Sequence, residues 1–224
     1  MLNSEDQSNT PWVNYAEFSL GGLLRFLSHQ ELLDLLARAA IRAQLPLAFS
    51  HGFNPRPKLS LPVPRSVGMS CEKDLARFEL TQPIADGELA DRLGPQLPDE
   101  LTIDRSWSTS VRQHPQPREV EWKIDLAGLN LGDLSRRVAE FLARPTWPIE
   151  RKSIKAHRPI PVDLRRFVLD LRIDETTLRA RLAAGPEGSI RPAELLAALE
   201  LPAPQGLARI SRTKIYWTNE AFLN

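Results

Sequence analysis

Strand-like and helix-like patterns alternate in the first half of this chain in an order that few folds share. Residues 28–45 and 86–97 carry apolar side chains at spacings of three and four, the period of a helix buried on one side. Four segments alternate as strands do: 13–20, 58–63, 75–81 and 101–107. The order β-α-β-β-α-β is that of a ferredoxin-like domain, in which two helices cover one face of a four-stranded antiparallel sheet.

The second half repeats this order with one extra strand. Helical patterns cover residues 131–144 and 191–199, and strand patterns cover residues 119–126, 150–155, 167–173, 176–183 and 207–217. Residues 113–118 contain two prolines and no apolar anchor, which is typical of a linker. We therefore predict an α+β protein of two tandem ferredoxin-like domains, residues 12–112 and 119–224, after a disordered tail of residues 1–11.

Composition excludes several classes of protein. No apolar run approaches the roughly 20 residues that a membrane-spanning helix needs. The polar N-terminus lacks the features of a signal peptide, so we expect a cytoplasmic protein. The single cysteine, Cys71, excludes an internal disulfide and the cysteine cluster that ligates an iron–sulfur centre. The formal net charge of +1 leaves any affinity for a polyanion to a local patch.

Residues with special backbone requirements are concentrated between Leu24 and Gly68. Ser28 and Glu31 have the spacing of a capping box, which predicts that a helix begins at Ser28, and Pro46 ends it. Residues 50–58 then combine one glycine with two prolines, as in a rigid turn. Because binding residues often lie on such loops, we interpret this one as a ligand site. Its candidate residues are Ser50, His51, Gly52, Asn54, Arg56 and Lys58. The alternative is a proline-rich hairpin tip with solvated charges.

These residues resemble a known family. The run Phe-Leu-Ser-His at 26–29, the Leu-Pro at 45–46, the sequence SHGFNPRPKLS at 50–60 and the glycine at 68 are similar to the radical-SAM-linked protein family. Members of that family are domains of unknown function found beside or fused to radical SAM enzymes. A weaker likeness continues through residues 191–196 and 210–216. The resemblance implies a radical SAM protein as partner. Gln30, Glu31 and Arg56 depart from the family's usual Leu, Asp and His.

Basic residues gather in two stretches of the second half. The candidates for binding phosphate groups are Arg151, Lys152, Lys155, Arg158, Arg165 and Arg166, with Arg212 and Lys214 on the closing strand. If the two stretches lie on neighbouring strands, they form a basic face beside Tyr216 and Trp217, whose rings could stack bases. Alternatively, these side chains simply point to water. Asp163 is expected to pair with Arg165 or Arg166. The predicted fold also resembles the repeat-processing RNA endonucleases of CRISPR systems, a likeness of fold alone.

Catalytic and metal-binding patterns are weak. His29 and His51 flank the predicted helix and are the weak candidates for a general acid–base pair. No third orienting group accompanies them, so we expect no catalytic activity of the chain's own. The sequence has no close ligand pair such as HxxxH or CxxC, so metal binding by His29, His51, Cys71 and Glu72 is not expected, and we predict no cofactor.

Three functions are compatible with these patterns. In the first, which we favour, the chain is a non-catalytic module that binds tRNA or ribosomal RNA and works with a radical SAM partner in RNA modification. In the second, it is a protein–protein adaptor for that enzyme and touches no nucleic acid. In the third, it is a metal-independent RNA endonuclease that uses His29 or His51.

Overall fold

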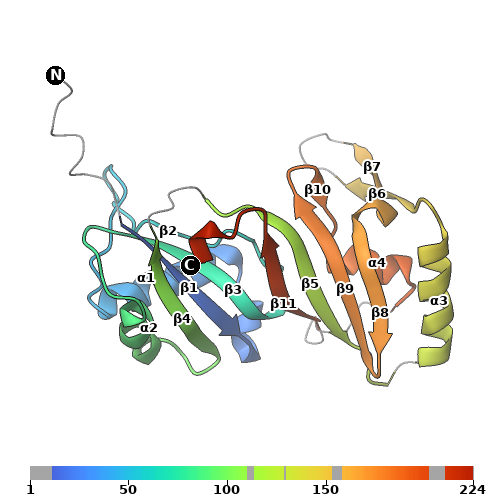
Figure 1. The fold of residues 1–224 in the computed structure, drawn as a ribbon, viewed down its shortest axis with the longest axis horizontal. Helices are drawn as coiled ribbons and strands as arrows, with labels where there is room; N and C mark the ends of the chain where they lie inside the picture. Colours follow the sequence, from blue (N-terminus) through green and yellow to red (C-terminus); the bar gives the residue numbers. More distant parts are fainter. Residues whose placement is uncertain (1–11, 110–113, 129, 153–157, 202–209, 224) are drawn as a thin grey trace. The chain divides into compact units, whose positions relative to one another are not determined.

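The computed structural model of this α+β protein divides into two units (Figure 1). It describes residues 12–109, 114–128, 130–152, 158–201 and 210–223. The first unit contains the chain up to Gln116 together with the chain end from Trp217, and the second contains Pro117–Tyr216. Among the described residues, no helix is both long enough and apolar enough to span a bilayer.

The first unit has the predicted order of elements. Its strands are β1 (Trp12–Leu20), β2 (Leu59–Ser60), β3 (Ser70–Leu80) and β4 (Leu101–Thr109). Its helices are α1 (His29–Arg42) and α2 (Glu88–Leu93), and short 3-10 turns are η1 (Gly22–Phe26) and η2 (Gly94–Gln96). The strands form an antiparallel sheet in the order β2-β3-β1-β4. Strand β2 ends at Ser60, earlier than predicted, because Pro62 and Pro64 cannot donate to a ladder.

One apolar core joins both helices of the first unit to one face of its sheet. Helix α1 begins where the capping box predicts: Ser28 accepts a hydrogen bond from the Glu31 amide, and its own amide donates to the Glu31 carboxylate at 2.8 Å. These bonds hold the pKa of Glu31 below its usual value. The core residues of the two helices and the strands they cover are Leu32, Leu36, Ala39, Ala40, Leu89, Leu93, Phe18, Leu20, Phe78 and Leu80.

The other face of this sheet receives the end of the chain. Phe222, in the 3-10 turn η4 (Ala221–Leu223), is buried with its ring centroid 5.0 Å from that of Tyr15. The indole of Trp107 donates to the Phe222 carbonyl, and the Thr218 amide donates to the Gln116 carbonyl. The domain boundaries predicted from sequence place this segment in the second domain, whereas its aromatic contacts assign it to the first unit.

The second unit carries an inserted hairpin. Its elements in order are β5 (Pro117–Asp125), α3 (Leu131–Ala143), β6 (Pro148–Lys152), β7 (Pro159–Asp163), η3 (Arg165–Phe167), β8 (Val168–Asp174), β9 (Thr177–Gly185), β10 (Gly188–Ser189), α4 (Pro192–Ala198) and β11 (Ile210–Trp217). The main sheet has the order β8-β9-β5-β11, with β10 also on β9, while β6 and β7 pair only with each other among the described strands. Strand β7 is absent from the prediction because Pro159 and Pro161 mask its pattern.

A buried arginine closes the segment between Leu24 and Gly68 into a loop. The guanidinium of Arg65, which is 8% exposed, donates to the carbonyls of Arg25 at 2.8 Å and Leu27 at 3.3 Å. It also donates to the carbonyls of Ser66 and Met69. The Gly68 amide adds a bond of 2.7 Å to the Arg25 carbonyl. Arg65 therefore fixes the entry to α1 against the chain that precedes β3.

Replacing Arg65 should destabilise the first unit strongly. Arg65→Met removes all the bonds that the guanidinium donates, including the buried bond to the Met69 carbonyl, so we expect the free energy of unfolding to fall by about 2–4 kcal/mol in urea titrations. Arg65→Lys should recover less than half of that loss, because an ammonium group lacks the planar fork. Arg42→Met is the control: it removes an exposed bond to the Gln96 carbonyl and should cost less than about 1 kcal/mol. Equal losses for Arg65→Met and Arg42→Met would contradict the role of Arg65.

Candidate functional site

The candidate binding loop, residues 48–58, is held at its base by the end of β3. The Ala48 amide donates to the Glu79 carbonyl at 2.8 Å, and the Glu79 amide donates to the Lys58 carbonyl at 2.9 Å. Within the loop, the Lys58 amide donates to Ala48 at 2.7 Å. Both ends of the loop are thus fixed by main-chain bonds to one residue of a sheet strand.

Ser50 joins the two sides of the loop above its base, through two bonds to Arg56. Its amide donates to the Arg56 carbonyl at 2.8 Å, and its hydroxyl accepts from the Arg56 amide at 3.0 Å. Gly52 has φ of +128°, a backbone conformation that favours glycine, and no atom lies within 4 Å of the position that a Cβ would take. The glycine is therefore required by backbone conformation rather than by a close approach of another group.

The loop presents an aromatic ring among polar and basic groups. The side chain of Phe53 is wholly exposed, and that of Phe49 is 44% exposed. His51, Asn54 and Arg56 are also exposed. Arg56 and His51 form no ion pair with any residue that the structure describes. The loop therefore carries an exposed aromatic ring, on which a base could stack, and an exposed arginine without an ion pair to any described residue.

Glu79 links the loop to a buried arginine of the sheet. Its carboxylate lies 3.8 Å from the Lys58 ammonium and 2.6 Å from the Arg77 guanidinium. Arg77 is 5% exposed, so it depends on Glu79 for neutralisation far more than Lys58 does. Burial also raises the pKa of the neighbouring Tyr15 hydroxyl, against the opposing influence of Arg77. Of the two loop cations Arg56 and Lys58, Arg56 is the one left fully available to a ligand.

The two histidines do not form an acid–base site with an orienting group. His29 is the first residue of α1, and its Nδ1 is buried without a hydrogen bond. His51 is exposed on the loop and makes no hydrogen bond within the part of the chain that the structure covers. Over the described ranges, no group of three or more His, Cys, Asp and Glu residues is placed to hold a metal ion.

The two basic stretches of the second unit are not on neighbouring strands. Strand β8 pairs with β9, whereas β11 lies next to β5 on the other side of β9. Arg212 is 1% exposed and lies over the Trp122 ring at 5.6 Å, so its guanidinium is not available at the surface. Lys214 is exposed with its ammonium 4.5 Å from the Tyr216 ring. The predicted basic face is therefore not assembled by these strands.

Several of its arginines have structural partners. Arg151 binds the Glu194 carboxylate at 2.8 and 2.7 Å, and Arg165 donates to the Val168 carbonyl at 2.9 Å. Arg166 pairs with Glu187 on the surface. Arg158 is exposed without an ion pair to any described residue. Lys155 lies outside the described residues, and of Lys152 only the backbone is described.

Asp163 has a different role from the one predicted. Its carboxylate accepts the backbone amides of Trp147 at 2.7 Å and Arg165 at 3.0 Å, instead of pairing with an arginine side chain. It thereby fixes the start and end of the inserted hairpin.

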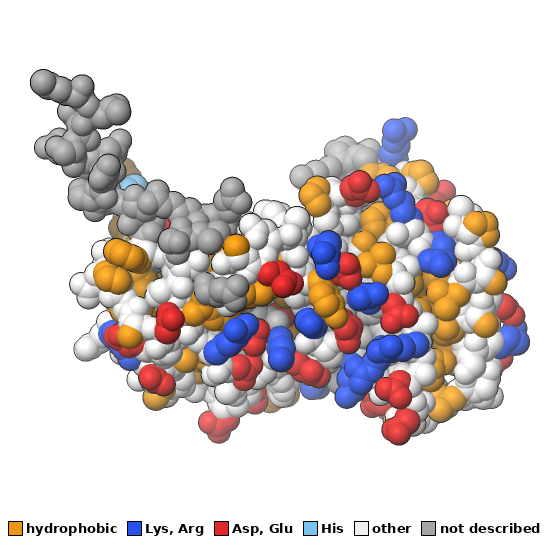
Figure 2. Space-filling view, in the orientation of Figure 1, with side chains coloured by type: hydrophobic (Ala, Val, Ile, Leu, Met, Phe, Trp, Pro, Cys, Tyr) orange, Lys and Arg blue, Asp and Glu red, His pale blue; other side chains and the backbone are white. Residues whose placement is uncertain are grey.

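The exposed sheet face of the second unit alternates in charge. Arg181 lies 3.6 Å from Glu119, and Arg179 lies within 4.0 Å of both Glu121 and Asp174. Figure 2 shows Lys and Arg side chains interspersed with Asp and Glu across these strands. Each arginine therefore faces a carboxylate, and this face gives a polyanion little net attraction.

Phe53 is the site residue that the sequence reasoning missed. The predicted site contained Gly52 and the polar residues of the loop but not its aromatic residue. The signal was present: an aromatic residue between Gly52 and Asn54, in a turn that buries little, has no apolar surroundings to enter. A large ring at a turn apex is a candidate contact residue in its own right.

Removing the Glu79 carboxylate should weaken the base of the loop. Glu79→Gln leaves the buried Arg77 without its counter-charge, so we expect the free energy of unfolding to fall by about 3 kcal/mol. Glu17→Gln is the matched control on the same sheet face, because Glu17 pairs with the exposed Arg105 and its loss should cost less than about 1 kcal/mol. Chemical denaturation measures both. Similar losses for the two variants would show that Arg77 does not depend on Glu79.

Comparison with known proteins identifies the family. No curated protein matches the chain. The model of DUF2344, described as an uncharacterized protein conserved in bacteria, matches residues 15–192, which include the whole of the loop and most of both units. The chain therefore belongs to the DUF2344 family.

Proposed function

We propose that this chain is a non-catalytic accessory module that binds single-stranded regions of tRNA or ribosomal RNA through residues 48–58. The observation that carries the proposal is the wholly exposed ring of Phe53 on the loop that also carries the exposed Arg56 and is held by main-chain bonds. An exposed ring stacks an unpaired base, a contact worth roughly 1–3 kcal/mol. Guanidinium groups bind phosphate through charge-assisted hydrogen bonds.

Charge supports nucleic acid as the ligand. Residues 48–58 contain no aspartate or glutamate, and Arg56 forms no ion pair with any described residue. With so few cations, the loop can contact only one or two phosphates of the RNA, so we expect affinity in the micromolar range. The slope of log K against log salt should be shallow, about 0.7 per phosphate for single strands. The second unit adds little to this footprint, because its arginines are largely paired.

The architecture is consistent with such a module. We infer that both units are ferredoxin-like, because the four main strands of each have the same order: β2-β3-β1-β4 in the first unit and β8-β9-β5-β11 in the second. In this interpretation the β6–β7 hairpin is an insertion. The radical SAM partner and a role in RNA modification rest on the sequence resemblance described above.

A second candidate function is favoured by exposed apolar residues. In the first unit, the segments around Phe26 and Val67 are joined by the bond from Gly68 to Arg25, and Leu23, Phe26 and Val67 are all exposed. Exposed apolar side chains that form one contiguous patch mark protein interfaces. In this alternative the first unit docks on the radical SAM protein and touches no nucleic acid.

RNA binding can be tested with three variants. Fluorescence anisotropy with labelled single-stranded fragments of tRNA and ribosomal RNA, at about 50–200 mM salt, should show Phe53→Ala weakening binding by roughly 5- to 100-fold. Arg56→Ala should weaken binding and reduce the salt slope by about 0.7. Arg166→Ala, which removes a surface cation paired with Glu187, is the control and should bind as the wild type does.

The opposite result separates the two candidate functions. Absence of wild-type binding at about 50 mM salt would exclude the RNA module, because electrostatic attraction is strongest there. Capture of a purified radical SAM partner that survives ribonuclease and high salt would then support the adaptor, and Phe26→Ala should weaken that capture.

A further inference from the structure

The two outer edges of the β6–β7 hairpin differ in their hydrogen-bonding capacity. Pro159 and Pro161 in β7 have no amide hydrogen, so the bonded pairs with β6 must be Ile149 with Val162 and Arg151 with Ile160. The proline nitrogens then face away from β6 and block the outer edge of β7. Conversely, the amide and carbonyl of Glu150 face away from β7, and they have no partner among the described residues. The outer edge of β6 is open.

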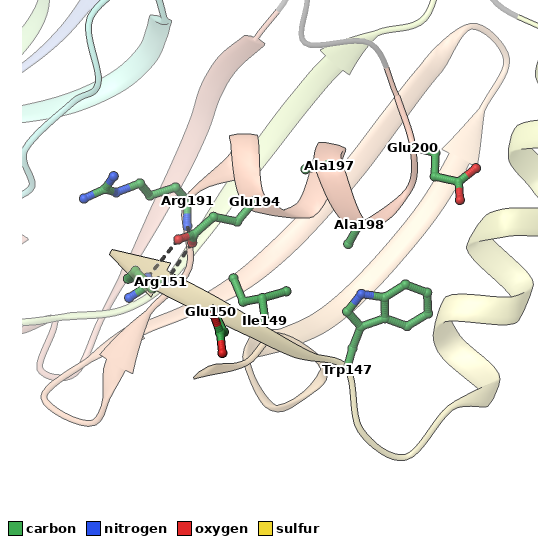
Figure 3. Close-up of a pocket in the computed structure, with 9 residues that line it drawn as sticks. All are labelled: Trp147, Ile149, Glu150, Arg151, Arg191, Glu194, Ala197, Ala198 and Glu200. Carbon is green, nitrogen blue, oxygen red and sulfur yellow. Dashed lines mark hydrogen bonds and ion pairs between the residues drawn. The ribbon is translucent and has the colours of Figure 1, made fainter. Parts of the chain in front are cut away.

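A groove of about 580 Å³ runs along this open edge, between β6 and α4. Figure 3 shows β6 passing beside α4 with the Trp147 ring near Ala198. Its apolar lining comes from Trp147, Ile149, Ala197 and Ala198, and the small alanines leave room above the strand. The Arg151 side chain binds Glu194 in α4, and side chains alternate along a strand, so Glu150 borders the groove with its main chain.

An ion pair links the two sides of the groove at one end. The Arg151 guanidinium binds the Glu194 carboxylate with two bonds and also donates to the Ser189 carbonyl at 3.0 Å. Glu194 in turn accepts the Arg191 amide at 2.8 Å, which caps α4. Strand β6 and helix α4 are thereby tied together at this end of the groove.

The groove does not suit a stacked aromatic ligand. The Trp147 ring is already contacted by the Arg144 guanidinium, 4.6 Å from its centroid, and by the Phe141 ring at 5.0 Å. Two carboxylates of the lining have basic partners: Glu194 binds Arg151, and Glu200 lies 3.8 Å from the Arg137 guanidinium. The remaining polar groups that face the groove are the main-chain groups of Glu150 and the Arg191 guanidinium, which has no ion pair with any described residue. Glu150 points its carboxylate away from α4 (Figure 3). The groove therefore offers main-chain bonds, an apolar floor and one positive charge.

We propose that the groove binds an extended peptide segment of a protein partner, which joins β6 as an added strand. The peptide exchanges main-chain hydrogen bonds with Glu150, as in other cases of strand addition. It places a small or medium apolar side chain between Trp147 and Ala198, and an acidic side chain near Arg191. The outer edge of β7 needs no such partner, because Pro159 and Pro161 already prevent pairing there. This function is separate from RNA binding by the first unit.

A matched pair of variants tests the main-chain contact. A displayed library of random peptides of about eight residues, a typical strand length, is selected on the full chain, and enriched peptides are measured by anisotropy. Glu150→Ala and Glu150→Pro both lose the carboxylate, but only the proline variant loses the amide hydrogen. We expect Glu150→Pro to bind enriched peptides about 5- to 10-fold more weakly than Glu150→Ala. Unchanged thermal unfolding is the check that the proline variant is folded, and Pro148, Pro159 and Pro161 already occupy outward positions of this hairpin.

A second variant tests the groove itself. Ala198→Leu keeps a good helix former in α4 but fills the space beside Trp147, so it should reduce peptide binding at least about 5-fold. Enriched peptides should carry an acidic residue, and Arg191→Ala should weaken their binding. The proposal is wrong if no peptide is enriched over background, or if both Glu150→Pro and Ala198→Leu bind enriched peptides as the wild type does.

Discussion

The first unit depends on the hydrogen bonds that Arg65 donates to main-chain carbonyls on both sides of a long excursion of the chain. Residues 28–64 contain α1, the binding loop and β2, and the bonds from Arg65 to the carbonyls of Arg25 and Leu27 join the two ends of this segment. A planar guanidinium can satisfy several carbonyls at once without a water molecule, which an apolar side chain cannot do. Gly68, at φ of +89°, lets the chain turn so that its own amide completes the closure at Arg25.

This closure explains why the most distinctive part of the sequence behaves as one piece. The helix is capped by Ser28, directly after the carbonyls that Arg65 holds, and the loop is fixed at its base by Glu79. Rigidity at both points means that Phe53 is exposed on a defined loop rather than on a free tether. A preorganised contact residue loses less conformational entropy on binding.

Local signals made part of the fold predictable, and long-range contacts decided the rest. The start of α1 follows from residues three apart, and so it was predicted correctly. The chain end returns to the first unit because Phe222 packs on Tyr15, a contact between residues far apart in sequence. Similarly, the burial of Arg212 is set by Trp122 on another strand, and no local pattern separates it from the exposed Lys214. Strand β7 shows the reverse case: prolines that argue against a strand are tolerated at an edge.

Strand pairing also explains why the arginines that are clustered in the sequence of the second unit do not form a basic surface. The pairing of β5 with β9 brings Arg181 within 3.6 Å of Glu119 and Arg179 within 3.9 Å of Glu121, so neighbouring strands supply the carboxylates that neutralise these arginines. Arg56 forms no ion pair with any described residue, because the loop that carries it contains no aspartate or glutamate. If the first unit uses Arg56 and Phe53 on RNA and the second uses the β6 edge on a peptide, the two ligands are held by different chemistry. Raised salt should then weaken the first interaction more than the second, since main-chain bonds and apolar contacts are little screened.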